Sequence, residues 1–592
     1  MSNRKAPQAS EKGMPVRLET ARNRIAPQQA RGPRPDPRGL TFAAVLAGKA
    51  REHGDAIFLK YLPDGRRYSY AKWNSLTATV AGNLQLQGIG PGTHVAVMMD
   101  NCPEQLLAYF GLARLGAVTV PINTAARGDL LEYLLTHADC HALIVDTASM
   151  PFVQEIIDRL PLVRRIIVHD AASTPGRQDD RPDPAADSPP PGRGIPQARF
   201  ASLLREYDGP PPASPRYSDL AFLMYTSGTT GPSKAIMCSQ AHTLYWGWDY
   251  ALHHGYDSSD TVYVYLPLFH GNAWLCGTLG ALMAGASIAM SRRFSASRFW
   301  SDVATAEATV TNCLGAVMSF LWARAPDVHE RNHKLRRMGV TPIPAFGDRI
   351  EARYGVRIMS SYGLTDFCSI ACYGPDAPRE KLGAAGLPRL GIEIRIVDEH
   401  DIDMAAGEPG EIIVRSNNPW GSASGYYKMP EATIESRRNL WFHTGDRGYL
   451  DEDGYLYFKD RLKDAIRRRG ENISAFEVES AIASHPDVAA VAAYPVRSDS
   501  TEDEVAVSVV LAAGKKLAPE ALIAHCGRNL AYFMVPRYVE FVGELPINAS
   551  QKIQKALLKE RAEQSLDGYW DKERAGGVEL RPTQRPAFVK HE

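Results

Sequence analysis

The chain has 592 residues, of which 44% are hydrophobic and 23% are charged. This is ordinary globular usage, and at about 100–200 residues per domain the length predicts more than one domain. Lysine plus arginine and aspartate plus glutamate balance at 67 each, so the overall charge favours neither a nucleic-acid-binding protein nor a halophilic or disordered one.

The terminal and low-complexity segments come first. Residues 1–37 are polar and basic and predict a disordered arm; without an apolar core they are not a signal peptide. The proline-rich stretch 171–197 predicts a loop, and 566–592 predicts a polar, extended tail. No uncharged apolar run is long enough to span a membrane. The nearest run, 273–290, is interpreted as a buried helix.

The eight cysteines are scattered and contain no C-x-x-C pair. This argues against a disulfide scaffold and a structural zinc site, and it predicts a reducing compartment, the cytoplasm. Cys368 and Cys372 would share one side of a helix, and such a single pair indicates packing rather than metal binding.

Apolar strands alternate with helical segments in the first part of the chain. Strands are expected at 94–99, 117–122 and 142–146, with helices at 103–115 and 130–137 between them. Apolar strands separated by helices predict parallel sheets, so this region is assigned to the α/β class.

The pattern changes after Arg461, and a domain boundary is expected near 461–464. We predict an N-terminal domain over 38–460 and a compact α+β domain over 461–565. The elements expected in the second domain are helices at 475–484 and 519–529 and strands at 488–496, 504–512 and 537–542.

A glycine- and hydroxyl-rich loop, YTSGTTGPSK at 225–234, follows the apolar strand predicted at 220–225. Its backbone N–H groups, hydroxyls and lysine could together hold a polyphosphate. It is not a Walker loop, since the glycine at 231 lies three residues before the lysine. A plain hydroxyl-rich turn is the alternative for this loop alone.

Four further segments follow in order: LPLFHGNAW (266–274), SSYGLTD (360–366), WFHTGDRGYLDEDGYLYFKDRLKDAIRRRGENIS (441–474) and LPINASQKIQK (545–555). Together with the loop they resemble the adenylate-forming superfamily of acyl-CoA synthetases, peptide-synthetase adenylation domains and firefly-type luciferases. The C-terminal segment is most similar to crotonobetaine/carnitine-CoA ligases. The resemblance implies a large N-terminal domain of stacked doubly wound sheets, a small barrel-like subdomain over 383–415, and a small mobile C-terminal domain.

The resemblance also implies the site residues. Tyr362 would pack on adenine, Asp366 would bind Mg²⁺, and the catalytic residues would be Lys552, Thr365 and His270, with His270 at the acyl pocket and CoA tunnel. The residues implied in ATP and AMP binding are Thr226, Ser227, Gly228, Thr229, Thr230, Gly231, Lys234, Tyr362, Gly363, Thr365, Asp446, Arg461 and Lys552.

In the C-terminal segments, Asp446 and Arg461 would bind the ribose, Lys463 would be the hinge, and Gly470 would line the tunnel for CoA. The basic run at 461–469 could instead suggest nucleic acid, but it has no interleaved aromatic residues, so we assign its arginines to the CoA phosphates.

Three positions depart from the family pattern. Asp366 replaces a glutamate but keeps the hard oxygen ligand that Mg²⁺ prefers. Gln551 replaces a glycine, and the strand at 338–342 matches only at its ends.

The implied activity is that of an ATP-dependent acyl-CoA ligase using ATP, Mg²⁺ and coenzyme A on a small-molecule carboxylic acid, as in fatty acid metabolism. Nucleic acid is not an expected partner. A homodimer is compatible with the family, and the sequence does not name the acid. The alternatives are a stand-alone adenylation enzyme that serves a carrier protein, a luciferase-like oxidase and a catalytically silent binding protein.

Overall fold

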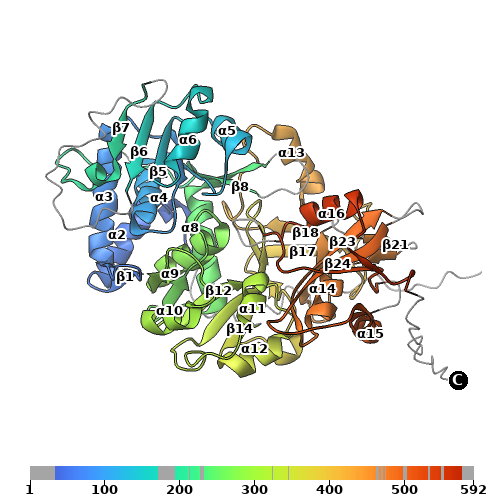
Figure 1. The fold of residues 1–592 in the computed structure, drawn as a ribbon. Helices are drawn as coiled ribbons and strands as arrows, with labels where there is room; N and C mark the ends of the chain where they lie inside the picture. Colours follow the sequence, from blue (N-terminus) through green and yellow to red (C-terminus); the bar gives the residue numbers. More distant parts are fainter. Residues whose placement is uncertain are drawn as a thin grey trace, which may run out of the picture.

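The computed structural model describes residues 34–170, 194–212, 214–226, 233–322, 324–344, 346–461, 466–468, 471–473, 475–497, 503–530, 534–547 and 553–575. The predicted arm and proline-rich loop lie almost wholly outside these residues. The described helices and sheets form an α/β architecture in which an N-terminal body lies beside a smaller C-terminal unit (Figure 1).

One large sheet carries the early part of the chain. Its strands run in the order β7-β6-β5-β3-β4-β8-β9 and are parallel except for the β8–β9 pair. Their bounds are β3 His94–Met98, β4 Val118–Pro121, β5 Ala142–Asp146, β6 Arg165–His169, β7 Gln197–Arg199, β8 Leu220–Tyr225 and β9 Ala235–Ser239. The predicted parallel strands are therefore confirmed.

The second large sheet has the order β16-β15-β14-β13-β12-β10-β11-β1-β2, with parallel pairing from β14 through β1. Its bounds are β1 Ile57–Tyr61, β2 Arg67–Ser69, β10 Thr261–Val264, β11 Ser287–Met290, β12 Val310–Leu314, β13 Arg337–Thr341, β14 Arg357–Gly363, β15 Ser369–Tyr373 and β16 Leu387–Pro388. These two largely parallel sheets confirm the expected stacked doubly wound sheets.

Helices pack on both sheets in the N-terminal body. They are α2 Phe42–His53, α3 Tyr70–Leu86, α4 Pro103–Leu115, α5 Gly128–His137, α6 Met150–Ile156, α8 Gln240–His254, α9 Leu279–Ala284, α10 Phe299–Ala306, α11 Gly315–Trp322, α12 Gly347–Tyr354 and α13 Pro430–Glu435. Helix α4 has the predicted bounds because Pro103 starts it and Gly116, at φ 78°, ends it in the left-handed conformation.

Two local predictions are wrong. The run 273–290 is not one helix: it holds a π-helix at Asn272–Thr278, then α9, then strand β11. Cys368 and Cys372 do not share a helix face, because Cys372 lies in strand β15 and Cys368 in the loop before it. In both regions the sequence is apolar throughout and carries no periodicity that separates strand from helix.

A smaller antiparallel sheet follows the two large ones; its first two strands fall in the segment 383–415 expected to form the subdomain, apart from Ser416, and its other two strands lie beyond it. It consists of β17 Ile392–Val397, β18 Gly410–Ser416, β19 Phe442–Leu450 and β20 Leu456–Arg461. The β19–β20 register places Asp446 opposite Arg461.

The C-terminal unit, orange to red in Figure 1, is α+β as predicted. Its elements are α14 Ala475–Ala483, α15 Pro519–Asn529, α16 Lys555–Gln564, the hairpin β21 Ile466–Arg468 and β22 Glu471–Ile473, and the sheet β23 Val488–Arg497, β24 Asp503–Leu511, β25 Tyr538–Phe541 and β26 Trp570–Asp571. Strand β26 lies inside the predicted polar tail and pairs with β25.

Aromatic side chains fill the core between the large sheets. The Trp274 ring stacks on Phe42 and meets Phe110 and Phe222 edge-on or tilted. This packing fixes the π-helix that carries Trp274. Among the described helices, none combines the length and apolar character needed to cross a membrane.

Candidate active site

A cavity of about 410 Å³ opens where three parallel strands of the second sheet end. Leu314, Thr341 and Tyr362 line it from the carboxyl ends of β12, β13 and β14. The carboxyl ends of parallel strands are where α/β sheets bind ligands. Other parts of the wall come from helix α8, the π-helix and the segment before it, residues 383–385, and strands β19 and β20.

Five of the predicted site residues line this cavity: His270, Tyr362, Gly363, Thr365 and Asp446. The Tyr362 hydroxyl donates a hydrogen bond of 2.8 Å to Asp446 Oδ2. Asp446 is only 3% exposed, so this bond fixes a buried carboxylate beside the ring. The two residues lie 84 positions apart in sequence.

A tight hairpin after β14 presents Thr365 and Asp366. The Leu364 N–H donates to the Cys368 carbonyl at 3.0 Å, which closes the loop. A Cβ on Gly363 would lie 2.9 Å from both the Cys368 carbonyl oxygen and the Ser369 Cα. Since both atoms belong to the backbone, only glycine fits this close approach.

His270 also lines the cavity and lies two residues before the π-helix. Its N–H donates to the Pro267 carbonyl at 3.1 Å, and its carbonyl accepts from Trp274 at 3.2 Å. A Cβ built on the neighbouring Gly271 would lie 3.6 Å from Thr365 Oγ1. The two segments that the sequence singled out therefore lie in contact at the edge of the cavity.

The structure describes the predicted phosphate loop only at its two ends, Thr226 and Lys234. The Thr226 N–H donates to the Lys234 carbonyl at 3.0 Å, which closes the loop between β8 and β9. Residues 227–232 between them, including the predicted Ser227, Gly228, Thr229, Thr230 and Gly231, lie outside the described residues.

Thr226, Lys234 and Asp366 are not among the residues that line the cavity. Tyr426 connects two of them: its hydroxyl donates to Asp366 Oδ2 at 2.7 Å, and Lys234 Nζ lies 4.5 Å from its ring centroid. The Lys234 ammonium and the Asp366 carboxylate thus gather around one tyrosine.

Four other predicted positions, Lys463, Gly470, Gln551 and Lys552, also lie outside the described residues. Arg461 is described through its strand pairing with Asp446. The hinge, the CoA tunnel and the catalytic lysine accordingly stay predictions.

Sequence reasoning missed several residues of the site. Trp246 and Cys276 line the cavity from α8 and the π-helix, and burial raises the pKa of the Cys276 thiol to about 12. The thiol therefore stays protonated near neutral pH and contributes a small apolar surface, not a nucleophile. No motif marked Trp246 or Cys276. Tyr426 was missed as well: it lies in the run GYYKMPEA, and its pairing with Ile236 of strand β9 is a tertiary contact that the sequence does not reveal.

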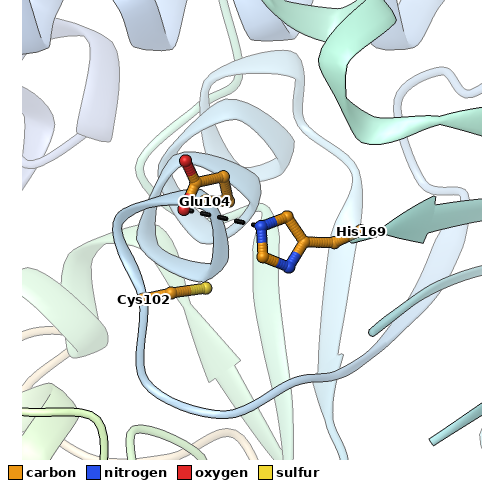
Figure 2. A group of neighbouring side chains, drawn as sticks. All are labelled: Cys102, Glu104 and His169. Atoms are coloured by element: carbon orange, nitrogen blue, oxygen red, sulfur yellow. Dashed lines mark ion pairs between the residues drawn. The ribbon is translucent and has the colours of Figure 1, made fainter. Parts of the chain in front are cut away.

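A separate polar group, Cys102, Glu104 and His169, lies at the start of α4 (Figure 2). Glu104 already pairs with Arg66 at 2.5 Å, and His169 Nε2 lies 3.6 Å from its other oxygen. Burial holds the pKa of the Cys102 thiol well above its usual value and lowers the pKa of His169, so both are neutral. The single carboxylate is balanced by the guanidinium, which fits a structural ion pair.

Comparison with known proteins agrees with this geometry. The family model of the AMP-binding enzyme matches residues 46–427, and that of the AMP-binding enzyme C-terminal domain matches residues 477–552. A crotonobetaine/carnitine–CoA ligase of Shigella flexneri is 31% identical over 501 residues, which cover 83% of this chain and 93% of the relative. The corresponding ligase of Escherichia coli O9:H4 (strain HS) matches to the same extent.

Solved structures share the fold. An anthranilate CoA ligase, AuaEII, in complex with anthranoyl-AMP has a TM-score of 0.79 at 23% identity, covering 88% of this chain and 97% of that one. ATP-bound MatB from Rhodopseudomonas palustris has a TM-score of 0.76 at 25% identity, covering 88% and 99%. The chain therefore belongs to the AMP-binding enzyme family of AMP-forming acyl-CoA synthetases.

Proposed function

We propose that this protein is an ATP-dependent carboxylate–CoA ligase that forms an acyl-adenylate, transfers the acyl group to coenzyme A, and releases AMP and pyrophosphate. The single observation that supports this most strongly is the cavity that gathers His270, Tyr362, Thr365 and Asp446 from three separate motifs. Membership of the family supports the class of reaction, and we assign the reaction to this cavity.

In the first half-reaction a carboxylate oxygen of the acid attacks the α-phosphorus of ATP. The bond to the β-phosphate bridging oxygen breaks, and pyrophosphate leaves with that electron pair. The protein contributes positioning and charge stabilisation. Asp446 and Arg461 would hold the ribose, Tyr362 the adenine, the loop 226–234 the phosphates, and the Lys552 ammonium would stabilise the charge that develops between the carboxylate and the α-phosphate.

The donor set at the hairpin fits Mg²⁺. Asp366 offers a carboxylate of which one oxygen accepts from Tyr426, and Thr365 adds a neighbouring hydroxyl. Mg²⁺ takes hard oxygen ligands and few of them from protein, alongside phosphate oxygens. When bound, the ion would neutralise phosphate charge, while this chain's own residues hold the nucleotide.

In the second half-reaction the CoA thiol displaces AMP from the anhydride and forms the thioester. The C-terminal domain would rotate about Lys463, withdraw Lys552, and bring Gly470 beside the incoming pantetheine. A rotation at the end of an element is a common form of domain motion. In the sequence, Lys463 comes two residues after Arg461, where strand β20 ends. A hinge at the end of a strand is consistent with this position.

The lining of the cavity favours an acid whose acyl group has a substantial apolar part. Trp246, Leu266, Cys276 and Leu314 line it, and among the described lining residues the one carboxylate is Asp446, already assigned to the ribose. An aromatic face such as that of Trp246 can also hold a quaternary ammonium, so the lining is compatible with a trimethylammonium acid as well as with a neutral one.

A substitution of Lys552 tests the assignment of the two half-reactions. The Lys552→Ala variant should lose acyl-adenylate formation, measured by pyrophosphate release, yet still convert supplied acyl-AMP and CoA to the thioester. Lys555→Ala is the matched control, because Lys555 is nearby but pairs with Glu479 at 2.6 Å. An equal loss of both half-reactions in Lys552→Ala would contradict the role given to Lys552.

A further inference from the structure

Tyr426 joins two parts of the site that come from distant segments. Its side chain is buried, 6% exposed, and its hydroxyl donates to Asp366 Oδ2 at 2.7 Å. The same ring lies under Lys234, whose Nζ is 4.5 Å from the ring centroid. This distance is within the range of a cation–π contact, which attracts an ammonium to the face of a tyrosine.

The backbone around Tyr426 is fixed to the strand that carries the phosphate loop. The Met237 N–H donates to the Gly425 carbonyl at 2.9 Å, and the Tyr427 N–H donates to the Ala235 carbonyl at 2.8 Å. The Tyr426 N–H donates to Thr433 Oγ1 at 3.0 Å. Tyr426 therefore moves with β9 and Lys234, while its hydroxyl reaches the hairpin after β14.

The Tyr426 hydroxyl can act only as the donor in this contact, because an ionised carboxylate only accepts. A neutral hydroxyl beside a carboxylate donates and does not repel it. A hydrogen bond to an ionised group is worth more than one between neutral groups, and it restricts the rotation of the carboxylate.

The hydrogen bond from Tyr426 engages only one of the two oxygens of the Asp366 carboxylate. Oδ2 is held by Tyr426, so Oδ1 is the oxygen that can face the nucleotide side. Aspartate is one methylene shorter than the glutamate of the family pattern, so it reaches less far and depends more on how it is oriented. We propose that Tyr426 is a positioning residue that aims Asp366 and Lys234 at Mg·ATP, an inference that rests on the proposed adenylation function.

The test compares Tyr426→Phe with a matched control on the next residue. Tyr427 also donates its hydroxyl to a carboxylate, Asp139 Oδ2, at 2.8 Å, but that carboxylate is outside the site. Isothermal titration calorimetry of each variant with Mg·ATP, and with ATP in the presence of EDTA, measures binding without turnover. We expect Tyr426→Phe to weaken Mg·ATP binding about tenfold, with a smaller effect on metal-free ATP, because one hydrogen bond to a charged group is removed.

Two further measurements separate positioning from general damage. Tyr427→Phe should bind Mg·ATP like the wild type, and Tyr426→Phe should keep thioester formation from supplied acyl-AMP. Adding Tyr426→Phe to Asp366→Ala should cause no further loss, since both changes break the same contact. Thermal unfolding midpoints of the variants show that each is folded.

Unchanged Mg·ATP binding in Tyr426→Phe, an equal loss in Tyr427→Phe, or additive effects with Asp366→Ala would each overturn the inference. A different result would contradict the proposed function: wild-type protein that binds Mg·ATP but releases no pyrophosphate with any acid tested. The binding comparison does not depend on turnover, so the two failures are distinguishable.

Discussion

Replacing Gly363 by alanine tests how closely the hairpin geometry controls the chemistry. The added Cβ would lie 2.9 Å from two backbone atoms, the Cys368 carbonyl oxygen and the Ser369 Cα, where ordinary contacts begin at 3.4 Å. Relieving the clash needs a shift of about 0.5 Å in a loop closed by the hydrogen bond from Leu364 to Cys368. That loop carries Thr365 and Asp366, so both should move relative to Tyr362 and the nucleotide.

A misplacement of about 1 Å can cost about a hundredfold in rate, so a shift of half that size should cost at least about tenfold. We expect kcat/KM for acyl-adenylate formation, measured by pyrophosphate release, to fall by at least that factor in Gly363→Ala. Gly280→Ala is the control, because Gly280 is buried in α9 and its Cβ would make only an ordinary contact of 3.4 Å with Tyr256. A Gly363→Ala enzyme as active as the control would refute the close-approach argument.

Two further predictions follow from buried polar groups. Tyr362→Phe leaves the buried Asp446 carboxylate without its 2.8 Å donor, so the free energy of unfolding should fall by about 2 kcal/mol, seen as a thermal midpoint lower by a few degrees; an unchanged midpoint would contradict it. Burial lowers the pKa of His242 to about 4, so the unfolded chain binds more protons below pH 6.5. His242 should therefore account for a stability loss of about 2 kcal/mol between pH 6.5 and 5, absent from His242→Gln in urea unfolding at the two pH values; an equal pH dependence in both proteins would argue against it.

Much of the fold could be predicted because its signals are local. Pro103 and Gly116 mark the two ends of α4, and short apolar runs mark β3 and β5. The run 273–290 failed because it is apolar throughout, so packing against Phe42 and its neighbours decides between helix and strand. Tertiary context overrides propensity in such segments.

Some residues of the site could likewise be predicted from local motifs, and others could not. Tyr362, Thr365 and Asp446 stand in recognisable motifs, and the structure brings them to one cavity. Tyr426 could not be predicted, because its place depends on pairing with Ile236, far away in sequence. Trp246 in the cavity wall could not be predicted either, because no sequence pattern connects α8 with the hairpin after β14.

The most direct test of the central claim is mass spectrometry of the products formed from Mg-ATP, CoA and a mixed panel of carboxylic acids, with crotonobetaine beside neutral apolar acids. The account predicts CoA-dependent release of AMP together with an acyl-CoA whose mass corresponds to one of the acids in the panel. Accumulation of acyl-AMP with no thioester, in the presence of CoA, would contradict the ligase assignment and favour an adenylation enzyme that serves another acceptor.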